Sequence, residues 1–383
     1  MDPEPLLVIH EVIPREILVM IFEEHAKLEW RAPATDGRVC HLWRQIVLNT
    51  PRAWAYLEIR YKKPPNFWNL LMWLDRSRTA PLHIRVDRNF TLNKPINDQS
   101  LYDLLSQYHT RIASLRMDIG DLGFFKGRDF PCMRLLDVAR WNAMSYSLPP
   151  AQWGAMPELQ SLRLGRTDSV VGLMDGIAPL KTLALHIPKF TSLSRHSPSL
   201  VALMLRSVSL GDTISSSLDF PSLTHLSLYR VGGLKPHINA PCLAIYHEGR
   251  CTVSESFSAP VPSLVEYGVR GLHPQYSDPT KWHCSFPNIL RLSIRADPPL
   301  LISFLDSLSS HPHPMPALQM ISVGSMRMWG AELLAEYQGI MGTLVRVRSE
   351  RCLLDIGLYF EMGRPSHIPM FFGNVSNSPS DDL

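Results

Sequence analysis

Pro157-Glu158-Leu159-Gln160-Ser161-Leu162-Arg163-Leu164 is the stretch that decides the fold, because its pattern recurs along most of the chain. The pattern is a proline, a short spacer and then apolar-x-x-apolar-x-apolar. Clear copies begin their apolar run at Leu159, Leu180, Leu200, Leu223, Leu264, Ile289 and Leu318, and weaker copies at Ile112, Met133 and Leu243. Neighbouring copies start 20 to 29 residues apart. Such regular recurrence predicts a chain built from stacked repeats.

The apolar-x-apolar end of each copy predicts a short strand. Side chains alternate along a strand, so Leu162 and Leu164 should point into a core while Arg163 points away from it. A period of about 20–29 residues is that of leucine-rich repeats, whose strands pair in parallel. We therefore predict an α/β chain with an irregular leucine-rich-repeat-like solenoid over residues 56–372. Its turns should be irregular, because the Asn or Cys of a regular repeat is replaced, as at Thr167, Pro188 and Val208.

Outward-facing strand positions are the surface through which solenoids bind partners. Here they carry mainly arginine and one aromatic residue: Arg116, Arg163, His186, Arg206, Tyr229, Arg270, Arg291 and Arg295. Arginine and tyrosine are favoured at binding hot spots, and an acidic or phosphorylated segment of a target protein would suit the charge. The alternative interpretation is that solvent-facing strand positions are simply polar. The sequence leaves both open.

Residues 1–55 carry a different, helical pattern. Ile13, Ile17 and Ile21 recur every four residues, which predicts one apolar face on a helix. Pro14 suits the first turn of that helix, because the N–H it lacks has no partner there. A second run predicts another helix, which Pro51 ends: Val39, Leu42, Trp43, Ile46 and Val47. Two such short helices cannot bury all their large side chains alone, so their apolar faces must meet the rest of the chain or another protein.

Three spaced motifs carry a family resemblance: Ile13-Pro14-Arg15-Glu16-Ile17-Leu18-x-x-Ile21-Phe22, Val39-Cys40-x-x-Trp43-Arg44-x-Ile46 and Thr50-Pro51-Arg52-x-Trp54. Together they resemble the F-box, in the form found in the large fungal F-box group. The resemblance implies that this module binds a Skp-type adaptor, and through it a cullin, while the repeats hold a target protein. The residues that would form or brace the adaptor face are Pro14, Ile17, Leu18, Ile21, Phe22, Val39, Cys40, Trp43 and Trp54. The chain departs from the family pattern at Asp36-Gly37-Arg38, where an apolar helix start is usual, and in the irregular loop 30–35.

Composition narrows the functional classes. Hydrophobic residues make up 45% and charged residues 19% of the 383 residues, which is typical of a globular chain. A net charge of +3, with no dense Lys/Arg stripe, gives no case for nucleic-acid binding. There is no signal-peptide pattern and no apolar run of about 18 residues, so we expect no membrane partner and a cytoplasmic or nuclear location. The short polar segment 373–383 should be disordered.

Catalytic motifs do not occur. The sequence has no phosphate-binding glycine loop, zinc-protease helix or nucleophile elbow, and its six cysteines are too far apart for a zinc site. His311 and His313 alternate with prolines, which favours a surface loop over a metal site. We therefore expect no enzymatic activity, no cofactor and no metal.

The favoured function is that of a substrate-recognition subunit of an SCF-type ubiquitin ligase, in which the module holds the adaptor and the repeats hold the target. The alternative is a repeat scaffold outside any ligase, whose N-terminal helices cap the solenoid. An exposed apolar patch on Ile17, Phe22 and Trp43 would favour the receptor. A hydrolase or transferase would need converging titratable groups, which the sequence does not show.

Overall fold

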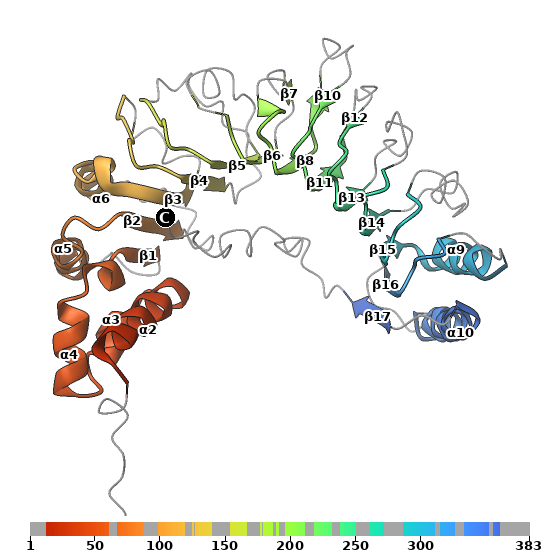
Figure 1. Cartoon of the computed structure of the whole chain (residues 1–383), viewed down its shortest axis with the longest axis horizontal. Coiled ribbons are helices and arrows are strands. Elements are labelled where there is room, and N and C mark those ends of the chain that lie inside the picture. Colours follow the sequence, from red (N-terminus) through yellow and green to blue (C-terminus); the bar gives the residue numbers. More distant parts are fainter. Residues whose placement is uncertain are drawn as a thin grey trace, which may run out of the picture. The chain divides into compact units, whose positions relative to one another are not determined.

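The computed structural model describes residues 13–60, 67–87, 99–118, 125, 127–139, 154–166, 177, 179–186, 189–190, 196–210, 218–231, 238–249, 261–271, 286–310, 315–325, 333–351 and 355–360 (Figure 1). The chain forms two compact units, Met1–Ile214 and Ser215–Leu383. The segment 373–383 and the pair His311 and His313 lie outside the described residues.

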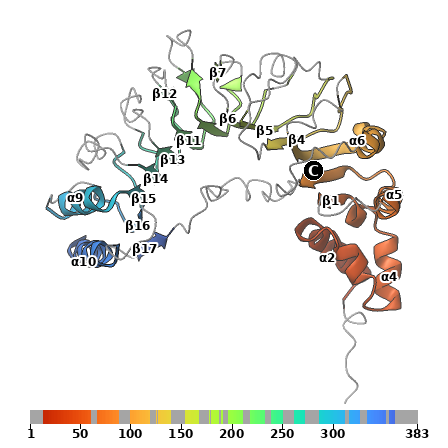
Figure 2. The same ribbon diagram turned by 180° about the vertical axis from the view of Figure 1, so that it is seen from behind.

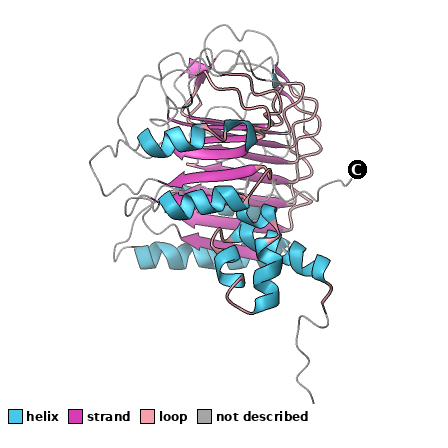
Figure 3. Ribbon diagram, turned by 90° about the vertical axis from the view of Figure 1, so that its left-hand side faces the viewer, coloured by secondary structure: helices cyan, strands magenta, loops and turns pink. Residues whose placement is uncertain are grey.

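The first unit begins with the predicted helical module (Figure 3). Its elements are α2 (Arg15–Leu28), α3 (Ala32–Asp36), α4 (His41–Leu48) and the 3-10 helix η1 (Pro51–Trp54). Pro14 stands at the N-terminal boundary of α2, and its carbonyl accepts the first helical hydrogen bonds from Ile17 and Leu18. At the start of α4, the Cys40 Sγ accepts a hydrogen bond from the Trp43 amide at 3.5 Å. The helices pack because apolar side chains four residues apart on α2 face the other helices.

Seven strands of the first unit pair in parallel and in sequence order. They are β1 (Tyr56–Arg60), β2 (Leu82–Asp87), β3 (Ile112–Asp118), β4 (Leu135–Ala139), β5 (Ser161–Arg166), β6 (Thr182–His186) and β8 (Ala202–Arg206). Between them lie α5 (Phe67–Arg76), α6 (Gln99–Ser106), the 3-10 helix η2 (His109–Arg111) and the short strand β7 (Lys189–Phe190), which pairs with β9 (Ser209–Leu210) after β8. Parallel strands need such crossover segments, which the residues between repeats supply.

The second unit repeats the arrangement with six parallel strands (Figure 2). They are β11 (His225–Tyr229), β13 (Ile245–Gly249), β14 (Glu266–Arg270), β15 (Arg291–Ala296), β16 (Met320–Ser325) and β17 (Asp355–Phe360). The short pair β10 (Leu218–Asp219) and β12 (Ile238–Asn239) precedes β11 and β13, and the crossovers near the end form α9 (Pro298–Ser310) and α10 (Leu333–Arg351). Asp306 of α9 and Arg346 of α10 form an ion pair.

The repeat pattern sets the register of both units. Leu162, Leu183 and Leu203 are cross-strand partners in the first unit, and all three are buried. In the second unit, Leu226 starts a buried row that continues through Tyr246. The prediction of N-terminal helices followed by solenoid repeats with parallel strands is therefore confirmed.

The prolines of the repeats have a local role. In six repeats the amide of the first apolar residue donates to the carbonyl three residues earlier, at 3.1–3.3 Å: Met133 to Phe130, Leu159 to Met156, Leu223 to Phe220, Leu243 to Ala240, Leu264 to Val261 and Leu318 to Met315. Each of these turns has proline directly after the acceptor residue, where the ring already holds the backbone angle that a tight turn requires. In these repeats the proline thus turns the chain into the strand, as the sequence pattern predicts.

Candidate partner-binding surfaces

Helix α2 has two apolar faces. One face consists of Leu18, Phe22 and Ala26, which are four residues apart and buried. The Phe22 ring contacts the Trp43 ring edge-on, with centroids 5.0 Å apart. The other face is exposed, with exposed fractions of 45% for Ile17, 61% for Met20, 45% for Ile21 and 86% for Leu28. We call these four residues the α2 stripe, and nothing in the described part of the chain covers them.

The nine residues expected to form or brace an adaptor face divide into three groups. Pro14, Ile17, Ile21 and Val39 are exposed; Cys40 and Trp43 are half-buried; Leu18, Phe22 and Trp54 are buried. The apolar patch on Ile17, Phe22 and Trp43 is thus only partly exposed, because Phe22 packs inside the module. Met20 and Leu28 were missed, although their spacing from Ile17 places them on the same face of the helix.

Trp54 joins the module to the first repeat. Its indole N–H donates to the Val47 carbonyl at 2.8 Å, and its ring lies 4.8 Å from that of Trp73 in α5. The Arg76 guanidinium also lies over the Trp54 ring, 4.4 Å from its centre. Trp30 completes the cluster against Trp73 at 5.7 Å. Such aromatic packing holds the module firmly against β1 and α5.

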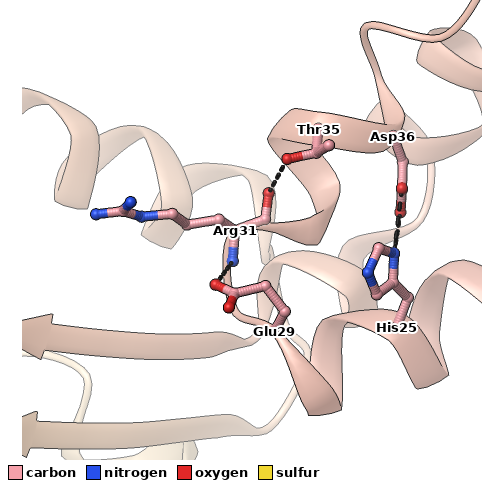
Figure 4. A network of polar contacts seen from close by, with 5 residues as sticks. All are labelled: His25, Glu29, Arg31, Thr35 and Asp36. Atoms are coloured by element: carbon pink, nitrogen blue, oxygen red, sulfur yellow. Dashed lines mark hydrogen bonds and ion pairs between the residues drawn. The ribbon is translucent and has the colours of Figure 1, made fainter.

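Asp36 stands where the F-box pattern usually has an apolar helix start, and its carboxylate has a partner within the chain (Figure 4). Asp36 is buried, with 6% of its surface exposed, and its Oδ2 lies 3.1 Å from the Nδ1 of His25 on α2. The next residue is tied down as well, since Arg44 Nε donates to the Gly37 carbonyl at 2.9 Å. Because the buried carboxylate has a partner, the polar sequence at this position is compatible with a packed module.

The loop before α3 is also ordered by polar contacts (Figure 4). Glu29 accepts a hydrogen bond from the Arg31 amide at 3.2 Å, and the Thr35 hydroxyl donates to the Arg31 carbonyl at 3.4 Å. The expectation of an irregular loop over residues 30–35 is therefore wrong for residues 32–35, which belong to the short helix α3 (Ala32–Asp36).

A row of charged side chains of both signs crosses the outward face of the first unit. Glu58, Arg85, Arg116, Asp137 and Arg163 are partners in register on five successive strands. Arg85 Nε lies 3.6 Å from the Glu58 carboxylate, and the Asp137 carboxylate lies 3.4 Å from Arg116 Nε and 3.9 Å from Arg163 Nε. We call these five residues the charge ladder. Two of the arginines predicted to face a partner are thus already matched by a carboxylate of this chain.

Two stacked rings, one on β1 and one on β2, lie on the same face at the end nearest α2. The rings of Tyr56 and His83 lie 4.6 Å apart and nearly parallel. Burial raises the pKa of Tyr56 to about 12, and the negative charge of Glu24 adds to the effect. Burial lowers the pKa of His83 to about 4, with a further contribution from the positive charge of Lys27. Side chains of α2 therefore act on this end of the strand face.

On the outward face of the second unit, one carboxylate lies beside two basic side chains. The Glu266 carboxylate lies 3.4 Å from His247 Nε2 and 3.7 Å from Arg291 Nη1. Its hydrogen bond with His247 lowers the pKa of Glu266, and Arg291 contributes to the same shift. Arg291, a predicted partner-binding residue, is exposed but has this carboxylate beside it.

A second row of positions crosses the same strands near their C-terminal ends. Tyr229, Gly249, Arg270, Arg295, Gly324 and Tyr359 are partners in register. The Arg270 guanidinium lies over the Tyr229 ring, 5.5 Å from its centre. We call these six positions the arginine row. The two remaining predicted partner-binding residues, His186 and Arg206, are half-buried on β6 and β8 of the first unit.

The sequence prediction missed the carboxylates among these arginines. Asp137 follows Leu136 and precedes Val138, so strand alternation alone places it on the outward face. It also missed Glu248, which alternation places on the inward face beside Tyr246. The hydroxyls of Tyr246 and Tyr267 both donate to the Glu248 carboxylate, the first at 2.7 Å. Burial raises the pKa of Glu248, and the two hydrogen bonds oppose that shift.

Within the described ranges, no group of three or more His, Cys, Asp or Glu side chains is arranged to hold a metal ion. None of the helices in the described part of the chain is long and apolar enough to span a membrane. No protein-family model matches the chain, and no curated protein sequence matches it.

Proposed function

We propose that this protein is a substrate-recognition subunit of an SCF-type ubiquitin ligase. The observation that supports the proposal is the α2 stripe, an apolar helix face left exposed while the opposite face of the same helix is fully packed. Contiguous exposed apolar residues on a soluble domain mark interaction sites. The stripe belongs to the segment whose three motifs resemble the F-box, for which a Skp-type adaptor is the expected partner.

The module is held in a way that suits such a role. A receptor must keep its adaptor and its target at a defined separation, because the other subunits supply the transfer chemistry. Trp54, Trp73 and Arg76 tie the helices to the first repeat, so a bound adaptor would be fixed relative to the strands of the first unit. The strand faces would then hold the target.

The alternative is a repeat scaffold whose N-terminal helices only cap the solenoid. The burial of Phe22 and Trp54 favours it, because these side chains already have partners within the chain. Capping the solenoid, however, does not require the exposed apolar residues of the α2 stripe. The two functions therefore differ in what happens when the stripe alone is changed.

We expect the double variant Ile17→Glu, Ile21→Glu to lose adaptor co-purification. Each change removes apolar burial worth about 1.5–3 kcal/mol from an interface and places a charge there. Both side chains are exposed, so the module should stay folded. Phe22 is unsuitable for this test, because it belongs to the core of the module.

Arg15→Glu is the matched control, since it adds negative charge at an exposed position of α2 outside the stripe. It should retain adaptor. Circular dichroism and the melting temperature check the fold of both variants. If the folded double variant recovers as much adaptor as the unmodified protein, the receptor proposal is wrong and the scaffold takes its place.

A further inference from the structure

We infer that two copies of this protein pair through the N-terminal ends of the strands of the second unit, about a two-fold axis between β14 and β15. These ends lie opposite the strand ends that carry the arginine row. The inference does not depend on the proposed function, because the α2 stripe belongs to the first unit.

An uncharged belt runs along this end of the strands. It is formed by the residue that follows the first apolar position of five repeats: Thr224, Ala244, Val265, Leu290 and Gln319. The amide of each of the last four donates to the carbonyl of the one before it, at 2.9 Å, so the five residues are neighbours in space. Val265 and Gln319 are exposed, and the other three are half-buried. The belt therefore presents apolar side chains at the surface.

The first unit shows that the fold does not require such a belt. Three successive equivalent positions there are Arg134, Gln160 and Lys181, which are joined by the same backbone hydrogen bonds and are all exposed. The repeat therefore accepts charge at this position. Apolar residues at an exposed position that tolerates charge indicate contact with another molecule.

The neighbouring row on the outward face indicates which molecule fits. Its six register partners read histidine, apolar, acidic, basic, apolar and acidic: His225, Ile245, Glu266, Arg291, Met320 and Asp355. A two-fold axis through the middle of this row pairs apolar with apolar and acidic with basic. The corresponding positions of β3, β4, β5, β6 and β8 in the first unit are uncharged: Ser114, Leu135, Ser161, Thr182 and Ala202.

This symmetry makes a second copy of the chain the matching partner. In a two-fold contact the same patch of both copies meets itself, so each pairing forms twice. With the axis between β14 and β15, the two uncharged belts face each other. Glu266 lies opposite Arg291 of the second copy, and Ile245 lies opposite Met320 of the second copy. A partner with one sign of charge would match only half of the row.

Arg291 can contact both copies at once. Of its side chain 61% is exposed, and its Nη1 lies 3.7 Å from the Glu266 carboxylate of its own chain, which is longer than a hydrogen bond. The guanidinium has five N–H donors in a planar fork. It can therefore keep the contact within its chain and pair with a carboxylate of the second copy.

The contact is small, so the dimer should be weak. Five strands spaced by about 4.8 Å span about 19 Å, which gives each copy less than the roughly 800 Å² of a standard interface. We expect a Kd of about 10–100 µM. Sedimentation velocity of the full-length protein over about 2–200 µM should therefore show a shift from monomer to dimer.

Exchange of the two charges tests the arrangement. Glu266→Arg alone and Arg291→Glu alone each place like charges opposite each other, so each variant should be monomeric up to about 200 µM. An equimolar mixture of the two variants should form a dimer again, with a Kd within about threefold of that of the unmodified protein. Neither variant keeps the pair within its own chain, so recovery on mixing reports a contact between copies.

Val265→Lys tests the belt without changing that pair. It places a charge in the apolar contact and should raise the Kd about tenfold or more. Gln160→Lys is the matched control, since it adds the same charge at the equivalent exposed position of the first unit, and its Kd should stay within about twofold. Circular dichroism and the melting temperature check the fold of each variant. If a charge exchange prevents folding, Val265→Lys still decides the question.

Three results would overturn the inference. A monomer throughout the concentration range would remove the interface. A mixture of Glu266→Arg and Arg291→Glu that stays monomeric would rule out the two-fold arrangement. A dimer that Val265→Lys leaves unchanged would place the contact elsewhere. Adaptor co-purification, measured on the same variants, should not change, so its loss or retention reports on the proposed function alone.

Discussion

On the strand face of the first unit, Asp137 lies between Arg116 and Arg163, whereas in the second unit Arg270 lies over Tyr229 with Arg295 on the next strand. Both faces are built on the same repeat and both are rich in arginine. In the first unit a carboxylate contacts two arginines, and in the second unit an arginine lies over an aromatic ring whose close approach to the next strand Gly249 allows. The repeat therefore fixes where a side chain points, while the residue on the neighbouring strand decides which contact that side chain makes.

The largest effect should follow from breaking the charge ladder at its centre. Asp137→Ala removes a buried carboxylate, 7% exposed, that contacts an arginine on each of the two neighbouring strands. We expect a loss of about 1–3 kcal/mol in the free energy of unfolding, because the arginines are partly hydrated and recover some of the cost. Native-state hydrogen exchange should show this loss as faster exchange of the amides of β3, β4 and β5.

Glu158→Ala is the control for this prediction. Glu158 is exposed in the turn before β5, so its removal should change stability by less than about 0.5 kcal/mol. Equal effects of the two substitutions would mean that the ladder contributes no more than ordinary surface charge.

Much of the fold can be read from the sequence, because a strand position is determined by a short pattern. The run at Leu162 and Leu164 specifies which side chains are buried, and the proline before each run specifies the turn. The boundary between the compact units, after Ile214, has no such signal. It falls within the repeat array, where the apolar spacing continues without interruption.

The candidate surfaces were harder to predict for a physical reason. Whether Phe22 or Ile17 faces outward depends on how α2 packs against α4, and both residues fit an apolar helix face equally well. The pairing of Arg116 with Asp137 likewise depends on strand register, which joins residues 21 positions apart. Local spacing shows which residues share a face, but it does not show what lies opposite them.

Acid should destabilise the first unit locally, and this is the next largest effect. The pKa of His83 is about 4 in the folded protein, while an ordinary histidine titrates near 6.5. Below pH 6.5 His83 is protonated in the unfolded chain but stays neutral in the folded protein. Protonation therefore favours the unfolded state, and stability decreases as the pH falls from about 6.5 to about 4. Opening free energies of β1 and β2 amides, from native-state hydrogen exchange, should therefore decrease over this range. His83→Phe, which keeps a ring against Tyr56, should remove the trend.

The second unit should respond in the opposite direction around β13 and β14. Burial raises the pKa of Glu248 above its ordinary value, so this carboxyl favours the folded state most when protonated and loses that contribution as the pH rises past about 4.5. Each unit of pKa increase corresponds to about 1.4 kcal/mol. The same hydrogen-exchange series tests this, and Glu248→Gln should make the region more stable at pH 7. A common slope in both units would contradict the assignment of the two groups.

The smallest effect should come from the outer end of the charge ladder. Arg85 Nε lies 3.6 Å from the Glu58 carboxylate, but nearly half of the Arg85 side chain is exposed. Water competes for both charges there, and exposed ion pairs contribute about 0.2–1 kcal/mol at most. Arg85→Gln should therefore lower the free energy of unfolding by less than about 0.5 kcal/mol, and the difference should vanish in high salt. A loss as large as that of Asp137→Ala would mean that the ladder acts as one coupled network, and the contrast between its buried centre and its exposed end would have to be abandoned.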